Sequence, residues 1–362
     1  MIHRFLALLS ACSASGLLGS CESARFYSQA VNGQAQMLRQ ARKIELVEAD
    51  PESSKTLRGQ LALVDELKQF ARTELHLPVQ KQYRTFADLR RPYAVVNVYA
   101  APEFSVEAKT WWYPFVGAAK YRGFFDERMA REEAAQLRRR GYDVYLGGVR
   151  VYSTLGWFPD PVLNTFIGDE PSGLAETVFH ELTHARVFIR GDSDFNEAFA
   201  TANAQEGVRR WLRAKGDVSA LARFEEALRR DEKILALLAR TRVRLNALYE
   251  NKDKIPVEAL RQAKARELDA ARREYAAMQR RGEADHTRDG WFGKQFNNAR
   301  LASVATYYDL VPAFEAMLRN CHGDLERFYA SVAEMRKLEM TERRRRLQEL
   351  SPPVPSAGSV RS

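Results

Sequence analysis

The chain has 362 residues, of which 45% are hydrophobic and 28% are charged, and its formal net charge is +9. This composition is typical of a globular, helix-rich protein that is long enough to bury a core without disulfides. The basic excess consists of arginines spread over the predicted helices, with one dense run from Arg343 to Arg346. Because no nucleic-acid-binding motif accompanies that charge, we expect no nucleic-acid partner.

The N-terminal segment predicts export and lipid attachment. Basic residues at 3–4, an apolar and small-residue run at 5–18 and Leu-Gly-Ser-Cys at 18–21 have the layout of a signal peptide with a lipobox. Residues 1–20 would then be removed, and Cys21 would be the lipidated first residue. An ordinary signal peptide or a membrane anchor is the alternative, but the run is shorter than the ~20 residues of a spanning helix. We therefore expect a lipoprotein tethered to a bacterial envelope membrane through Cys21 and facing the periplasm.

Periodicity in the remaining sequence predicts an α+β fold that is mostly helical, with a small antiparallel sheet and a long helical hairpin. We expect residues 21–350 to form one zinc-peptidase domain. The predicted segments are helices at 24–85, the sheet at 93–125, a charged helix at 126–140, strand–turn–strand around Gly147 and Gly148 at 142–151, two helices from about 171, the hairpin at 217–281 and a disordered tail at 351–362.

The most informative stretch is His180-Glu181-Leu182-Thr183-His184, which reads H-E-x-x-H. Residues four apart on a helix lie on one face, so both imidazoles can bind one zinc ion, and the adjacent glutamate can act as general base on a bound water. The alternative is a pair of surface histidines on an ordinary helix. Ser172 is the expected N-cap and Gly191 the expected stop, which places both histidines mid-helix.

A catalytic zinc site needs a third protein ligand and one open position. We expect Glu197 to be that ligand, since it opens a second apolar helix and only 12 residues, 185 to 196, separate it from His184. Asp192 or Asp194 is the alternative ligand. Asp194-x-x-Glu197 is also a capping box, in which Glu197 would cap its own helix instead of binding metal.

Several segments resemble known zinc peptidases. Asn-Glu-Ala-Phe-Ala at 196–200 resembles the segment with the third ligand in gluzincins, the His-His-Glu zinc peptidases, although the connection from His184 is shorter here. Three other segments resemble the predicted zinc aminopeptidase family of bacterial envelope lipoproteins. They are Tyr-Ala-Ala-Pro-Glu-Phe at 99–104, Val-Arg-Val-Tyr-Ser-Thr-Leu-Gly-Trp-Phe-Pro-Asp-Pro at 149–161, and Asn-Asn-Ala-Arg-Leu at 297–301 running on to Val-Pro-Ala-Phe at 311–314.

This resemblance implies peptidase activity, a peptide substrate and Zn²⁺ as cofactor. In gluzincins an edge strand before the zinc helix pairs with the peptide backbone, and the corresponding position of 149–154 implies that Tyr152 and Ser153 line the cleft. Tyr307, in the family-like Thr-Tyr pair, is the expected donor to the oxyanion, with Tyr308 as the alternative. Each of these residues could equally be part of the core.

The predicted function is that of a zinc-dependent aminopeptidase with Glu181 as general base. An aminopeptidase also needs an acidic group for the substrate ammonium, and the usual Gly-x-Met-Glu-Asn motif is absent, so Glu103 or Asp160 would have to replace it. The alternatives are an endopeptidase of the same chemistry, or a non-catalytic envelope assembly or chaperone-like lipoprotein with a structural zinc site. The presence of Glu181 favours an enzyme, because a structural site has no use for a general base.

Overall fold

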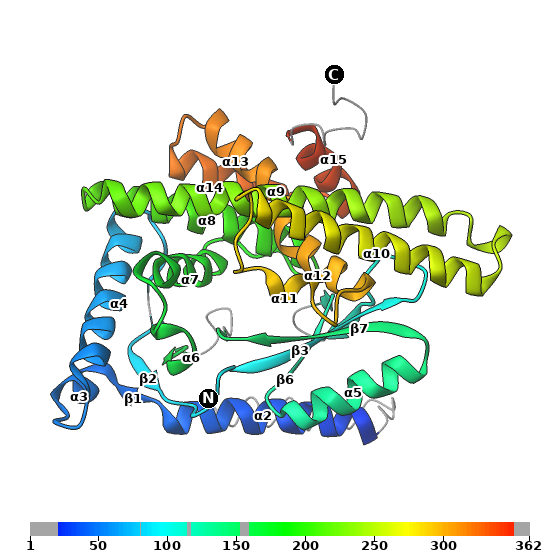
Figure 1. Cartoon of the computed structure of the whole chain (residues 1–362). Coiled ribbons are helices and arrows are strands. Elements are labelled where there is room, and N and C mark those ends of the chain that lie inside the picture. The colour runs from blue at the N-terminus through cyan, green and yellow to red at the C-terminus, as the bar shows by residue number, and fades with distance from the viewer. Residues whose placement is uncertain (1–20, 80, 114–116, 153–158, 351–362) are drawn as a thin grey trace.

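The structure, a computed structural model, describes residues 21–79, 81–113, 117–152 and 159–350 (Figure 1). The predicted signal peptide, Ser153 and the predicted disordered tail lie outside these residues. Among the described residues, no helix combines the length and apolar character that a membrane crossing requires.

The N-terminal part is helical, as its periodicity predicts. It consists of α2 (Cys21–Gln40), α3 (Ile44–Ala49) and α4 (Lys55–Thr73). A small sheet of order β1-β2-β8 joins this part to later chain, through β1 (Arg42–Lys43), β2 (Thr85–Ala87) and β8 (Val162–Leu163). The α2 helix packs under the main sheet, where the Phe26 and Phe124 rings meet edge to face at 5.3 Å.

The main sheet has three described strands. Its central strand β3 (Val95–Pro102) pairs antiparallel with β6 (Arg122–Phe124) and with β7 (Tyr142–Val149), and β4 (Trp111–Tyr113) pairs with β5 (Gly117–Ala119) as a separate hairpin. Helices α2 and α5 (Glu127–Arg139) lie below this sheet, and α12 (Asn298–Tyr308) lies above it (Figure 1). The sheet therefore has two covered faces.

One strand departs from the sequence expectation. We predicted strand–turn–strand around Gly147 and Gly148, but β7 runs through both glycines in register with β3. Gly148 serves close packing rather than a turn, because a Cβ there would lie 2.5 Å from atoms of the Tyr93 ring. Two glycines in a strand thus mark a close approach of a side chain.

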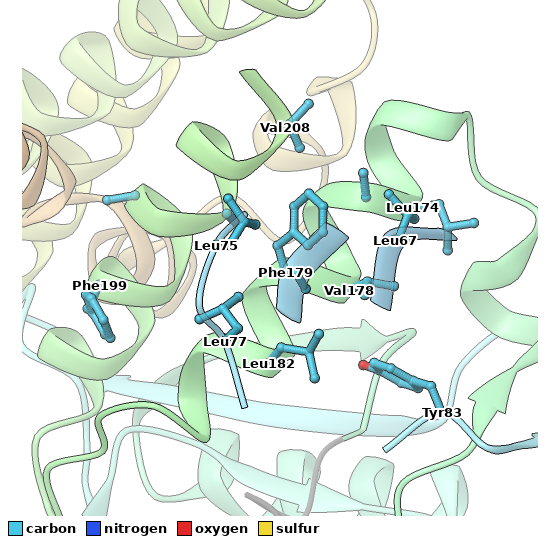
Figure 2. Packing of buried hydrophobic residues seen from close by; sticks show 14 of the residues in the cluster. Leu67, Leu75, Leu77, Tyr83, Leu174, Val178, Phe179, Leu182, Phe199 and Val208 are labelled. Atoms are coloured by element: carbon cyan, nitrogen blue, oxygen red, sulfur yellow. The ribbon is translucent and has the colours of Figure 1, made fainter. Parts of the chain in front are cut away.

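The central helices α7 (Pro171–His184) and α8 (Ser193–Ala214) pack against each other and fill the main core, with the short helix α6 (Asn164–Ile167) before them. Phe179 and Leu182 from α7 lie among Leu75, Leu77 and Phe199, all buried (Figure 2).

The predicted ends of α7 were wrong. The N-cap is Glu170 without a side-chain capping bond, and Pro171 occupies the first turn, so Ser172 is not the cap. At the other end α7 stops at His184, well before Gly191. The first histidine therefore lies within the helix, and the second is its last residue.

The predicted hairpin is formed by α9 (Val218–Tyr249) and α10 (Val257–Arg280), joined through the 3₁₀ turn η1 (Lys252–Lys254), and α11 (Asp289–Phe292) follows it. The hairpin has its own apolar cluster, in which Tyr275 and Phe292 stack at 4.1 Å. Lys264 attaches it to the sheet, since its ammonium donates to Asp143 Oδ2 at 2.7 Å and to the Glu103 carbonyl at 2.8 Å.

The C-terminal helices close over the start of α8. They are α13 (Val311–Asn320), α14 (Leu325–Glu334), the turn η2 (Met335–Lys337) and α15 (Met340–Leu350). Arg343 of α15 is buried, and its Nε donates to Asp192 Oδ2 at 2.8 Å. Arg344 donates to the other oxygen of Asp192 at 2.8 Å and to Asp194 at 3.0 Å. Asp192 is the N-cap of α8, so these arginines hold the beginning of that helix in place.

We expect Arg343→Ala to lower the free energy of unfolding by ~2–3 kcal/mol, because the buried Asp192 carboxylate loses one of its two arginine partners and keeps only Arg344. Urea denaturation followed by circular dichroism measures this. Arg345→Ala is the matched control, since Arg345 lies on the same helix and makes exposed ion pairs with Glu342 and Glu349. Equal effects of the two changes would contradict the structural role assigned to Arg343.

Candidate metal centre

Two histidines and one glutamate converge between α7 and α8. The imidazoles of His180 and His184 lie one helical turn apart, with ring centroids 4.9 Å from each other and planes at 83°. Glu197, in the second turn of α8, places Oε2 3.2 Å from Nε2 of His180 and 3.9 Å from Nε2 of His184. One carboxylate oxygen therefore faces both imidazole nitrogens.

The neighbouring Glu181 belongs to the same group of side chains. One ligand atom from each of His180, Glu181 and His184 lies within 4.8 Å of the other two, so these three residues could hold a metal ion. Imidazole nitrogens and carboxylate oxygens are the donors that Zn²⁺ accepts. His184 is buried, and its Nε2 is the ring nitrogen that faces Glu197, which makes that nitrogen the one placed to bind a metal ion.

Hydrogen bonds between the two helices fix the motif. Thr183, inside the H-E-x-x-H stretch, donates to the Phe179 carbonyl at 2.7 Å and accepts from Asn203 of α8 at 2.7 Å. Asn203 in turn accepts from the Tyr329 hydroxyl of α14 at 3.0 Å. The histidine-bearing turn is therefore tied to α8 by a buried polar chain, and it cannot rotate without breaking these bonds.

The loop that connects the two helices is short and closed by one side chain. Asn196 is buried, accepts from the Ile189 amide at 2.8 Å and donates to the Ile189 carbonyl at 2.7 Å. This bidentate contact sets the start of α8, so that the next residue, Glu197, points back to α7. The Asn-Glu pair thus has a local physical reason: the asparagine closes the loop and the glutamate faces the histidines.

The contacts of Glu197, Asp192 and Asp194 differ, and they bear on which of these residues faces the histidines and which caps α8. The α8 helix begins at Ser193 and its N-cap is Asp192, whose side chain accepts from the Phe195 amide at 3.3 Å. The capping box at Asp194 is therefore not formed, and Glu197 does not cap its own helix. Asp192 binds arginines of α15, and Asp194 accepts from Lys120 at 2.7 Å, so both aspartates are turned to cationic side chains.

Burial and mutual charge set the protonation of this group. Burial lowers the pKa of His184 to about 4, although the charge of Glu197 opposes it. At His180 burial acts in the same direction, but the hydrogen bond and charge of Glu197 outweigh it and raise the pKa. Burial acts to raise the pKa of Glu197, but the hydrogen bond to His180 and the charges of both imidazoles outweigh it and lower the pKa overall. At neutral pH His184 is thus a neutral imidazole and Glu197 a carboxylate, the states in which these groups bind metal.

Tyr307 is brought to this site from α12. Its hydroxyl is hydrogen-bonded to that of Tyr99 on β3, and the charge of Glu197 acts on both tyrosines. Burial, together with Glu197, raises the pKa of Tyr307 well above its usual value, so it keeps its proton at neutral pH. Tyr308, the alternative, lies among Arg288, Glu176 and Asp231 instead.

Sequence reasoning missed four residues around the site. Tyr99 is buried and Tyr121 is half-buried where the charge of Glu197 acts on both. Burial, together with the charges of Glu181 and Asp160, raises the pKa of Tyr83. Glu176 lies one turn before His180, and burial raises its pKa. The four-residue spacing to His180 was a signal for Glu176, and Tyr99 lies in a family-like segment, but no local pattern marked the others.

The remaining predicted residues have varied surroundings. Tyr152 follows the end of β7, packs against Phe125 at 4.9 Å and has a pKa that burial raises to about 12. Asp160 is buried beside Tyr83, whose amide donates to the Asp160 carbonyl at 2.8 Å. Glu103 is bound to Arg261 of the hairpin at 2.6 Å, so the structure does not bring its carboxylate to the histidines.

The fold and site define a mostly helical protein with a partly buried His-Glu-His group that could hold a metal ion, beside the carboxylate of Glu197. A family model described as "Putative aminopeptidase" matches residues 25–347, and the chain belongs to that family. No curated protein and no solved structure matches the chain. The family supports a peptidase function, which implies peptide substrates.

Proposed function

We propose that this protein is a zinc-dependent peptidase with a gluzincin-like core, acting as an aminopeptidase. The observation that carries the proposal is the meeting of His180, His184 and Glu197 across two helices, with Glu181 beside the first histidine. In this proposal His180, His184 and Glu197 are the zinc ligands and Glu181 is not. A ligand set of two histidines and one glutamate with a fourth, open position is that of hydrolytic rather than structural zinc sites.

The chemistry divides between the metal and the chain. Zinc, when bound, lowers the pKa of its water to about 7 and polarises the substrate carbonyl. Glu181 accepts the proton of the attacking water and later delivers it to the leaving amine. Thr183 and Asn203 keep the helix that carries Glu181 and both histidines in one orientation. Partial burial of the group lowers the local dielectric constant and strengthens each of these interactions.

Tyr307 is the proposed donor to the oxyanion that develops on the substrate carbonyl. Two features support this role: its proximity to Glu197, and a raised pKa that keeps its hydroxyl protonated at neutral pH. Removal of one such donor typically costs ~10²–10³ in rate. The neighbouring Tyr99 orients the hydroxyl through their hydrogen bond.

We expect one zinc ion per chain, and Glu197→Ala to lower the zinc affinity because one of three ligands is lost. Metal analysis of purified protein, followed by competition with a chromogenic chelator, measures stoichiometry and affinity. Asp194→Ala is the matched control, since it removes a carboxylate from the same helix that is bound to Lys120. Full zinc affinity in Glu197→Ala would exclude Glu197 as a ligand.

We expect Glu181→Gln to retain zinc and lose peptide hydrolysis by ~10² or more, because the amide keeps the shape but cannot take a proton. Mass spectrometry of a mixed peptide library treated with each protein measures the products. New termini that arise stepwise from the amino end identify an aminopeptidase, and internal cleavage identifies an endopeptidase. If both proteins leave the library intact, the peptidase proposal fails and a structural metal site takes its place.

We also propose that the protein is a lipoprotein of the bacterial envelope that faces the periplasm, on the basis of the Leu-Gly-Ser-Cys segment at 18–21. Expression in a lipoprotein-processing bacterial host should yield a diacylated or triacylated N-terminal peptide that begins at Cys21. Mass spectrometry of membrane-extracted protein tests this. Cys21→Ala should abolish the modification and release the protein from the membrane fraction, and an unmodified N-terminus elsewhere would refute the assignment.

A further inference from the structure

A row of aromatic rings leads away from the metal centre along the upper face of the main sheet. Tyr121, Tyr99 and Tyr145 follow one another across the strands, with successive ring centroids 5.6 Å and 5.7 Å apart. Tyr99 and Tyr145 are register partners on β3 and β7. The charge of Glu197 acts on Tyr121 and Tyr99, and Tyr99, the middle ring, is hydrogen-bonded to Tyr307, so the row connects the proposed catalytic group to Tyr145.

Arg300 of α12 lies at the far end of this row. Its guanidinium carbon is 4.1 Å from the centroid of the Tyr145 ring and 5.3 Å from the ring of Trp291. The side chain is half-buried, its Nε is fully buried without a hydrogen-bond partner, and burial lowers the pKa of the group. Among the described residues, no carboxylate forms an ion pair with Arg300. The fold thus holds a partly desolvated cation between two aromatic faces and leaves its charge without an anion.

Arg288 provides a comparison within the same cluster. It lies over the same Trp291 ring at 4.7 Å, but its guanidinium binds both oxygens of Asp231, with Nε 2.8 Å from Oδ1. Trp291 therefore contacts two arginines: Arg288, which is paired with a carboxylate, and Arg300, which has no such partner among the described residues. Partly buried guanidinium groups usually have an anionic partner, because desolvation of an unpaired charge is costly. Cation–π contacts offset part of that cost for Arg300 and leave its donors available.

We propose that Arg300 binds a carboxylate of the substrate, either an acidic side chain or the C-terminal carboxylate of a short peptide. This inference rests on the proposed peptidase function and assigns a specificity to the same site. The guanidinium fork matches a carboxylate in bidentate geometry. Arg300 and Tyr307 lie seven residues, or about 10 Å, apart along α12 and on one side of that helix. An extended peptide advances ~3.3 Å per residue, so a substrate bound at Tyr307 reaches Arg300 within a few residues of the cleaved bond.

The test measures binding without hydrolysis, in the zinc-loaded Glu181→Gln protein. The probes are hexa-alanine peptides with Glu or Gln placed at each position in turn, each with a free or an amidated C-terminus. Isothermal titration calorimetry should show ~10- to 100-fold tighter binding for one carboxylate-containing class, the scale of a charge-assisted hydrogen bond. Arg300→Met should remove this preference, and Arg300→Lys should keep part of it.

Arg223→Met is the matched control, because Arg223 also forms no ion pair with a carboxylate of the described residues but is exposed on α9, where its guanidinium donates to Ser219. It should bind as the parent does. Preference for Glu over Gln at one position identifies an acidic side chain, and preference for a free over an amidated C-terminus identifies the terminal carboxylate. If binding does not depend on a carboxylate, or the dependence survives in Arg300→Met, the inference is overturned.

The two proposals fail in different ways. Wild-type protein that binds carboxylate peptides through Arg300 but leaves them uncleaved refutes the peptidase proposal and retains this one. Wild-type protein that cleaves neutral and acidic peptides equally well, before and after Arg300→Met, retains the peptidase and refutes this inference. Thermal melting of each variant shows whether a loss of binding reflects a loss of fold.

Discussion

The close approach of α7 and α8 is the constraint on which the site depends. Gly207 of α8 faces Phe179 of α7, and a Cβ at that glycine would lie 2.8 Å from the Phe179 ring and from Leu75. Glycine within a helix costs ~1 kcal/mol relative to alanine, yet here it lets the two helices pack side by side. At that separation Glu197 reaches His180, and Thr183 reaches Asn203. A larger distance between α7 and α8 would break both contacts, and Glu197 would no longer face the two histidines.

The same packing explains why this polar group is poised for chemistry. Two imidazoles and the carboxylates of Glu181, Glu197 and Glu176 lie close together between α7 and α8, where burial opposes charge. Burial therefore shifts pKa values in opposite directions: it lowers the pKa of His184 to about 4 and raises the pKa of Glu176. Titratable groups whose pKa values are shifted by burial and by specific partners gather at functional sites. The C-terminal arginines on Asp192 hold the start of α8, the helix that carries Glu197, in place.

The surroundings of the site come from segments far apart in the chain. The sheet contributes Tyr99 and Tyr121, α12 contributes Tyr307 and Arg300, and the hairpin is anchored to the same sheet through Lys264. The helix α12, which covers the sheet, lies beside the metal centre and presents the aromatic side chain of Tyr307 and the cationic side chain of Arg300. The hairpin therefore has a structural part in the site, because it packs against the helix that carries Tyr307.

The sequence by itself determined the elements and the reactive motif, because both are local. Helical spacing predicted most helices and the hairpin, and the four-residue interval of His180 and His184 placed them on one face. Sequence reasoning failed where contacts between distant segments decide the outcome: Gly148 of β7 accommodates the Tyr93 ring, and α7 ends at His184, before a loop that Asn196 closes. Only the tertiary structure decided that Asp192 and Asp194 face cationic side chains and that Glu197 faces both imidazoles. It also decided that Arg300 lies at the end of a tyrosine row, with no carboxylate partner in the part of the chain that the structure describes. These are matters of which surfaces meet in space, and no periodicity along the chain encodes them.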